Sequence, residues 1–148
     1  MGEVVVTLRE VTAQTVGAIC DLEPRADQAR FVAPNAISIA QAYFEPAARF
    51  RAIYTGDEPV GFVMWRPSDK DGSCYLWRFM IDGRHQGKGY GRAALSILLG
   101  QCRSEGFRRM TLTFFPDEGG PGPFYARLGF RETGESRPNG ERFMERTL

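Results

Sequence analysis

The hydrophobic and polar positions near the start of the chain predict one strand followed by two short helices. Residues 4–9 are rich in β-branched side chains, which favours a strand. Thr12 is suited to cap a helix in the segment that follows. A second helix is expected from Ser38, because Ser38 and Gln41 have the spacing of a capping box.

The middle of the chain reads as three consecutive strands. Residues 49–55, 60–66 and 73–82 are rich in hydrophobic and aromatic side chains, and turn-rich segments separate them. Strands joined by short turns pair antiparallel, so we expect a meander here.

Beyond Gly89 the apolar residues repeat every three or four positions, which predicts a helix that stops at Gly106. Residues 108–115 then alternate between apolar and polar, so they are expected to close a β-helix-β unit that begins near Tyr75.

The C-terminal part adds one short helix and two strands. Residues 121–128 are expected to be helical and to end at Gly129, and two strand-like pieces flank a turn at 137–140. The elements together predict one α+β domain over residues 1–148, with a mixed, mostly antiparallel twisted sheet of about six or seven strands and about four flanking helices.

Composition narrows the class of protein. The 148 residues are 43% hydrophobic and 25% charged, which suits one globular domain, and the net charge of +1 gives no general attraction to nucleic acid or to an anionic membrane. The first residues lack the basic start of a secretory signal, and no apolar run is long enough to span a bilayer. The three cysteines have neither zinc-site nor disulfide-scaffold spacing, so we expect reduced thiols in the cytoplasm and no metal.

The stretch from 75 to 99 carries the clearest chemical signal. It is a strand, a glycine-rich turn and a helix in direct succession, an arrangement that can aim backbone N–H groups and a positive helix end at a phosphate. Lys88 and Arg92 add cations to the same turn. The alternative is a tight turn and helix cap with solvated cations.

Two familiar phosphate motifs do not match this turn. A P-loop requires a Ser or Thr directly after its Lys, whereas Gly89 and Tyr90 follow Lys88. A dinucleotide fingerprint is G-x-G-x-x-G after the first strand of a parallel sheet, whereas these glycines run G-x-G-x-G in the middle of the chain. We therefore expect a phosphate-bearing ligand other than a P-loop nucleotide or NAD.

Two motifs resemble those of the GNAT superfamily of acetyl-CoA-dependent N-acetyltransferases. QGKGYG at 86–91 is similar to the family signature Q/R-x-x-G-x-G/A, and PFYARLGF at 123–130 is similar to its later motif. The order of elements resembles a complete GNAT domain. The segments 31–44, 59–65 and 76–91 also resemble the bacterial spermine, spermidine and diamine acetyltransferase branch.

The resemblance implies acetyl-CoA as co-substrate and assigns its binding residues. The strand backbone at Phe79, Met80 and Ile81 would pair with the pantetheine arm. The turn would hold the pyrophosphate through its main-chain N–H groups. The turn residues concerned are Gly87, Lys88, Gly89, Tyr90, Gly91 and Arg92.

The resemblance also implies a catalytic residue, Tyr125, which would protonate the departing coenzyme A thiolate. Without the motif, Tyr125 would be read as an aromatic core residue. Glu118 stands where many members have an asparagine, and Thr113 or a neighbour stands where several have a glutamate base. His85 is more typical of a turn residue than of a base, so the sequence identifies no convincing base.

The expected acceptor is a primary amine of a small molecule, with spermidine, spermine or another diamine as the candidates that the branch implies. Acidic residues could attract such a cation, although each could equally be a solvated surface charge. The acids concerned are Asp21, Glu23, Glu45, Asp117, Glu118 and Glu141. Trp65 and Trp77 could wall an acceptor cleft or pack in the core. Neither motif contains a cysteine, which favours direct attack in a ternary complex.

Other functions stay open on the sequence alone. The acceptor could be an antibiotic, an amino acid or a peptide N-terminus. The chain could also be a non-catalytic acyl-CoA-binding module, or a glycine-rich nucleotide-binding protein. A homodimer is a further expectation, because Phe143 and Met144 on the last strand could form an interface or could belong to the core.

Overall fold

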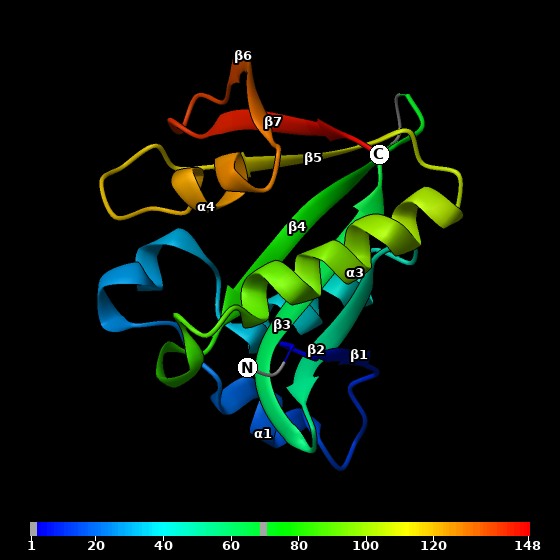
Figure 1. Ribbon diagram of the computed structural model, residues 1–148, viewed down its shortest axis with the longest axis vertical. Coiled ribbons are helices and arrows are strands. Elements are labelled where there is room, and N and C mark those ends of the chain that lie inside the picture. The colour runs from blue at the N-terminus through cyan, green and yellow to red at the C-terminus, as the bar shows by residue number, and fades with distance from the viewer. Residues whose placement is uncertain (1–2, 69–70) are drawn as a thin grey trace.

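A seven-stranded sheet organises the molecule, with strand order β1-β2-β3-β4-β5-β7-β6 (Figure 1). The computed structural model describes residues 3–68 and 71–148. The strands are β1 Thr7–Arg9, β2 Arg49–Thr55, β3 Glu58–Pro67, β4 Ser73–Ile81, β5 Arg109–Phe114, β6 Arg131–Ser136 and β7 Arg142–Thr147. The helices are α1 Val16–Asp21, α2 Asn35–Tyr43, α3 Tyr90–Ser104 and α4 Gly122–Arg127, with 3₁₀ turns η1 Ala26–Phe31 and η2 Gly83–His85.

The expected meander is confirmed. Strands β1 to β4 pair antiparallel in sequence order, and the boundaries of β2, β3 and β4 lie within two residues of the predicted ones. The first strand is shorter than expected, because only 7–9 pair with β2, and the side chains of Val4 and Val5 are 43% and 65% exposed.

Helix α3 connects β4 to β5, which makes these two strands the parallel pair of the sheet. Their pairing covers only 73–75 on β4 and 109–111 on β5. Beyond that point β4 remains paired with β3 and β5 with β7, so the two strands diverge (Figure 1). Their divergence splits the sheet into two halves and leaves an opening between them.

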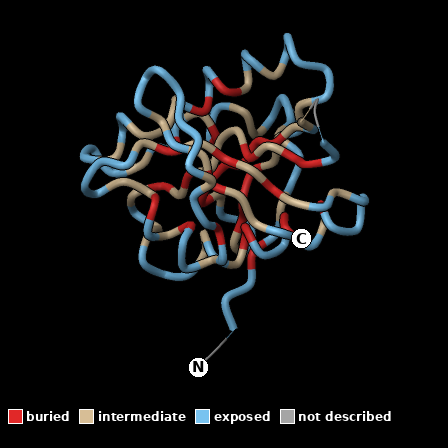
Figure 2. The backbone as a smooth tube through the Cα atoms, turned by 90° about the horizontal axis from the view of Figure 1, so that it is seen from above, coloured by how far each residue is buried: buried red, intermediate tan, exposed pale blue. Residues whose placement is uncertain are grey.

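Two hydrophobic clusters fill the two faces of the sheet. On one face, α3 and α4 pack against a cluster that includes Trp65, Leu98 and Met144. On the other face, α1 and α2 cover a smaller cluster around Phe62 and Met80. Buried positions lie in the interior of the backbone trace and exposed ones at its periphery (Figure 2). Burial of Met144 removes it as a candidate for a dimer surface.

Both predicted helix starts near the N-terminus are wrong. Helix α1 begins at Val16 with Thr15 as its N-cap, because the carbonyl of Thr12 accepts from the N–H groups of both residues and closes a turn before the helix. Helix α2 begins at Asn35, and Ser38 is buried inside it rather than capping it.

The start of α2 is set by a backbone turn at Pro34 and by the buried Asn35 rather than by the Ser38 motif. The carbonyl of Pro34 accepts from Ile37 and Ser38, so the first turn of the helix forms before Ser38. The buried Asn35 amide donates to the carbonyl of Ile19 at 2.9 Å and fixes α2 to α1. None of the described helices reaches the length and apolarity that crossing a bilayer requires.

Replacing Gly61 by alanine should destabilise the sheet next to the opening. A Cβ at Gly61 would lie 2.5 Å from the carbonyl oxygen of Met80 and 2.8 Å from Cδ1 of Ile81. Overpacking of this kind costs about 1–3 kcal/mol, which urea denaturation would measure as a lower free energy of unfolding. Gly17→Ala in α1 is the control, since a Cβ there meets nothing within 4 Å. A Gly61→Ala protein as stable as the wild type would contradict the packing described here.

Candidate functional site

The opening between β4 and β5 forms a pocket of about 1080 Å³. Its walls come from η1, β4 from Tyr75 onward, the turn before α3, the first turn of α3, the end of β5, the start of α4 and the β6–β7 turn. Because these segments lie far apart in the sequence and meet only where the strands diverge, the opening is the structural cause of the pocket.

The glycine-rich turn forms one end of this pocket. Gly89 is the N-cap of α3. Its φ of 86° is a left-handed backbone conformation that residues with a Cβ rarely adopt. The N–H groups of the first turn of α3 have no intrahelical acceptor, as in any helix, and no side chain at the N-cap accepts from them. A Cβ on Gly91 would meet the Phe124 ring at 3.3 Å. The turn can therefore offer several backbone donors and the positive helix end to an anion.

Gln86 has a role that the sequence motif alone does not reveal. Its amide donates to the carbonyl of Ile81 at 2.9 Å, and its side chain exchanges two hydrogen bonds with that of Gln28 in η1. Gln86 thus fixes the turn to the end of β4 on one side and to η1 on the other.

Asp82 makes a second connection at the same place. Its buried carboxylate accepts from the backbone N–H groups of Glu23 and Arg84 and pairs with the Arg84 guanidinium at 2.9 Å. Burial acts to raise the pKa of Asp82, but these hydrogen bonds outweigh it, and the pKa is held below its usual value. The carboxylate therefore stays charged and keeps the turn in place.

Of the six predicted turn residues, five line the pocket and Lys88 does not. Arg92 is exposed at the pocket rim, on the first turn of α3. Phe79, Met80 and Ile81 also line it, as the hypothesis of a strand edge beside the ligand requires. The ring of Phe79 stacks on Phe124 with centroids 5.8 Å apart, which joins β4 to α4 across the opening.

Tyr125 lies on α4 and lines the pocket. Its ring packs edge-on against Phe124 and Phe130, and only 7% of the residue is exposed. Burial, with a smaller contribution from Tyr75, raises the pKa of Tyr125 well above its usual value. The phenol therefore remains protonated and can act as a proton donor at any physiological pH.

A second group of polar side chains lies where the two strands begin to diverge. The hydroxyls of Tyr75 and Thr113 are 2.8 Å apart, and the Thr113 hydroxyl is 3.0 Å from Oε2 of Glu141. All three residues line the same pocket as Tyr125. Thr113 and Glu141 are 28 residues apart in the chain, and nothing in the sequence pattern brings them together.

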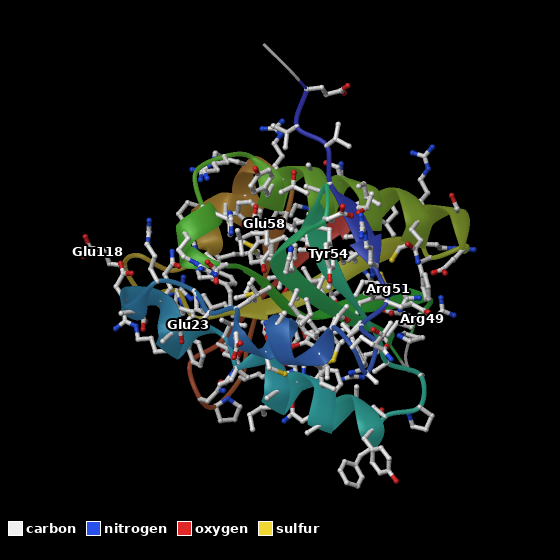
Figure 3. The ribbon with its side chains drawn as sticks, turned by 90° about the horizontal axis from the view of Figure 1, so that it is seen from below. Glu23, Arg49, Arg51, Tyr54, Glu58 and Glu118 are labelled. Carbon is white, nitrogen blue, oxygen red and sulfur yellow. The ribbon has the colours of Figure 1, made fainter. Side chains whose placement is uncertain are left out.

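The pocket carries much more positive than negative charge. Among its described lining residues, Glu141 is the one carboxylate, whereas there are six arginines: Arg25, Arg30, Arg78, Arg92, Arg127 and Arg137. The other five predicted acids do not line the pocket, and Glu118 lies at the outer edge of the molecule (Figure 3). Of the acids that could attract a cationic acceptor, Glu141 is therefore the one that lines the pocket among the described residues.

Two of the arginines lie beside aromatic rings close to Tyr75. Arg137 is 5.9 Å from the Tyr75 ring centroid, and Arg78 is 5.4 Å from that of Trp77. Arg78 also donates to the Gln41 side chain at 2.9 Å, and burial lowers its pKa. These contacts hold both guanidinium groups in place without a carboxylate partner among the described residues.

The two tryptophans and His85, which the sequence offers as further candidates, lie in different places. Trp65 belongs to the core, whereas Trp77 lines the pocket. His85 also lines it, but its Nε2 is 3.4 Å from the Glu58 carboxylate on the neighbouring β3, in keeping with a turn residue.

No described cysteine lines the pocket, and Cys74 and Cys102 are buried in the core, where their mutual contact and burial raise the pKa of the Cys74 thiol. The described residues contain no cluster of acidic, His or Cys side chains that could hold a metal.

Comparison with known proteins identifies the family. Residues 16–130 match the Acetyltransferase (GNAT) family. A spermine/spermidine N(1)-acetyltransferase of Bacillus subtilis (strain 168) is 31% identical, over 97% of this chain and 99% of that protein. A probable spermine N(1)-acetyltransferase of Bacillus subtilis subsp. natto is 30% identical over the same shares.

Solved structures share the fold. An acetyltransferase from Thermus thermophilus superposes with a TM-score of 0.74 at 21% identity, covering both chains fully. The PaiA N-acetyltransferase of Thermoplasma acidophilum, solved in complex with coenzyme A, has a TM-score of 0.74 at 13% identity, covering 98% of this chain and all of that one. With the strand opening and glycine turn described above, these matches show that the chain belongs to the GNAT family of acetyl-CoA-dependent N-acetyltransferases.

Proposed function

We propose that this protein transfers the acetyl group of acetyl-CoA to a primary amine of a small molecule, by direct attack in a ternary complex. The observation that carries the proposal is the continuity of the pocket. One opening joins the anion-binding turn before α3 to the buried hydroxyl of Tyr125 and the polar group around Tyr75.

Coenzyme A fits the residues that line the opening. The free N–H groups at the start of α3 would take its pyrophosphate, and the exposed Arg92 would add charge there. The pantetheine arm would pair with the strand backbone at 79–81, which faces the opening because β5 has moved away. The thioester would then reach Tyr125, which lines the same pocket.

Tyr125 would supply the proton for the leaving group. As the amine nitrogen forms its bond to the acetyl carbon, the C–S bond breaks and the thiolate takes the phenolic proton. A phenol with a raised pKa is a weak acid, but a buried thiolate beside it is a strong acceptor, so contact between them suffices. A covalent acetyl-enzyme is disfavoured because no described cysteine lines the pocket.

Within this class we propose spermidine or spermine as the acceptor, on two grounds. The two Bacillus relatives carry spermine-related names, and Glu141 offers one carboxylate for an ammonium group. The arginines favour a second candidate, an amine that also carries a carboxylate, because Arg78 and Arg137 line the pocket and can donate to an anionic group. The third candidate is a non-catalytic acyl-CoA-binding module, which would bind acetyl-CoA without turnover.

Gly89→Val should abolish acetyl-CoA binding. Valine cannot easily adopt a φ of 86°, so the turn must change shape and its N–H groups lose their common direction. Thermal stabilisation by acetyl-CoA is the measurement, and Gly100→Val is the control, since a Cβ at Gly100 in α3 meets nothing within 4 Å. Equal stabilisation of a folded Gly89→Val protein would exclude the turn as the phosphate site.

Tyr125→Phe should lower kcat by about 10²–10⁴-fold and leave acetyl-CoA affinity unchanged, because it removes the proton donor but keeps the ring. Steady-state kinetics with spermidine and a binding titration measure the two effects. Tyr54→Phe is the matched control, a buried tyrosine on β2 away from the pocket (Figure 3). A Tyr125→Phe enzyme with wild-type kcat would assign Tyr125 to packing.

Spermidine should be acetylated with a higher kcat/KM than butylamine, by less than about tenfold, and salt should reduce the difference. The reason is that a single partly exposed carboxylate contributes only about 0–1 kcal/mol. Thiol release would be measured at two ionic strengths with spermidine, butylamine, 4-aminobutanoate, kanamycin and an N-terminal peptide.

The same amine panel separates the candidates. If 4-aminobutanoate has a much higher kcat/KM than spermidine, that would contradict the polyamine assignment and favour an acceptor whose carboxylate binds the arginines. If kanamycin or the peptide has the highest kcat/KM by a wide margin, both small-molecule assignments would be wrong, while the acetyltransferase reaction would still hold. Acetyl-CoA binding without thiol release for any amine would favour the non-catalytic module.

A further inference from the structure

The hydrogen bonds among Tyr75, Thr113 and Glu141 have a direction that can be worked out. An ionised carboxylate only accepts, so the Thr113 hydroxyl donates its proton to Oε2 of Glu141 at 3.0 Å. The Thr113 oxygen is then the acceptor in its 2.8 Å contact with Tyr75, so the Tyr75 hydroxyl is the donor there. The Tyr75 oxygen also accepts from the Arg137 guanidinium at 3.5 Å, which leaves it one lone pair for a group in the pocket.

This chain of hydrogen bonds begins in the pocket and ends at a carboxylate near the surface. Tyr75 and Thr113 are half-buried, and the second carboxylate oxygen of Glu141 accepts from the exposed Asn139 at 2.8 Å in the β6–β7 turn. Tyr125 on α4 lines the same pocket as Tyr75. A proton that entered at Tyr75 would therefore leave on the solvent side.

We propose that Tyr75, Thr113 and Glu141 form a proton relay that removes a proton from the ammonium form of the acceptor before it attacks the thioester. The relay rests on the proposed function, since it requires an amine in the pocket. It is needed because an aliphatic amine with a pKa near ~10.4 is almost fully protonated at neutral pH and has no lone pair for attack.

The step balances. The ammonium gives a proton to the Tyr75 oxygen as the Tyr75 proton moves to Thr113 and the Thr113 proton moves to Glu141. The neutral amine then forms its bond to the acetyl carbon, the C–S bond breaks, and the thiolate takes the proton of Tyr125. The second nitrogen proton restores Tyr125, and Glu141 releases the first one to solvent. One amide, one thiol and one proton result.

Two guanidinium groups line the pocket on the side of the relay. Arg78 faces Glu141 from β4 and Arg137 from the β6–β7 turn, where the backbone N–H of Arg137 also donates to the Glu141 carbonyl at 2.8 Å. The Arg137 guanidinium lies 3.5 Å from the Tyr75 hydroxyl, so it can stabilise negative charge passing through that oxygen. On α4, Tyr125 is the titratable group that faces Tyr75, and its raised pKa keeps it neutral.

A purely electrostatic role for Glu141 is the alternative, and Thr113 distinguishes the two. If Glu141 only attracted the ammonium, the hydroxyl of Thr113 would not matter. A relay is interrupted by Thr113→Val, which keeps the shape of the side chain and changes no charge. The control is Thr111→Val, two residues earlier on β5, whose hydroxyl makes only a 3.5 Å contact with the Cys74 carbonyl.

The experiment measures kcat/KM for butylamine and spermidine from pH 7 to pH 10 in Thr113→Val, Glu141→Gln, the double variant and two controls. The controls are Thr111→Val and Glu135→Gln, an exposed acid on β6. At pH 7 each single variant should lose about 10²-fold, and the double variant should lose no more than the worse single one. The loss should shrink to a few-fold toward pH 10, where roughly a quarter of an amine with a pKa near ~10.4 is already unprotonated.

Two outcomes overturn the relay. One is a Thr113→Val enzyme with wild-type kcat/KM beside an impaired Glu141→Gln enzyme, which would leave Glu141 a binding charge. The other is a loss that stays constant from pH 7 to pH 10. If the wild type releases no thiol with any amine, the proposed function fails, and the relay fails with it. If instead the wild type is active and the Thr113→Val and Glu141→Gln variants are equally active, only the relay is contradicted.

Discussion

The divergence of β4 and β5 is the constraint on which the rest of the site depends. The two strands share three residue pairs and then separate, because β4 stays with β3 and β5 stays with β7. Separation leaves strand backbone facing a pocket instead of a neighbouring strand, which would be costly if nothing took its place. A ligand with an extended polar arm can fill that role, and the pantetheine of acetyl-CoA has this form.

Side-chain contacts around the opening hold its edges in place. Gln86 and Asp82 fix the turn before α3 to the end of β4 and to the segment around η1. The stacked rings of Phe79 and Phe124 join β4 to α4, which carries Tyr125. These contacts join the turn, β4 and α4 into one frame around the pocket.

Local patterns predicted most of the fold, and their failures have physical causes. Strand alternation and the glycine stops of α3 and α4 placed the meander, the crossover and the last three strands within a few residues. The Ser38 motif misled because Pro34 and the buried Asn35 already start α2 earlier. The two glycine and aromatic motifs led to the turn and to Tyr125, since each lies within one short segment.

The polar chain of Tyr75, Thr113 and Glu141 could not be predicted in the same way. Thr113 and Glu141 are brought together by the antiparallel register of β5 and β7, in which Phe114 pairs with Arg142. Tyr75 reaches them only because β4 runs parallel to β5 at that point. The acids expected near the pocket had no such register to fix them, and of the six only Glu141 lines it.

A crystal structure of the protein with acetyl-CoA tests the central claim most directly. We expect the pyrophosphate on the N–H groups at the start of α3, the pantetheine paired with the backbone at 79–81, and the thioester sulfur in hydrogen-bonding contact with the Tyr125 hydroxyl. The acetyl carbonyl should then lie between Tyr125 and Tyr75. Acetyl-CoA bound outside the opening, or with its sulfur turned away from Tyr125, would contradict the account.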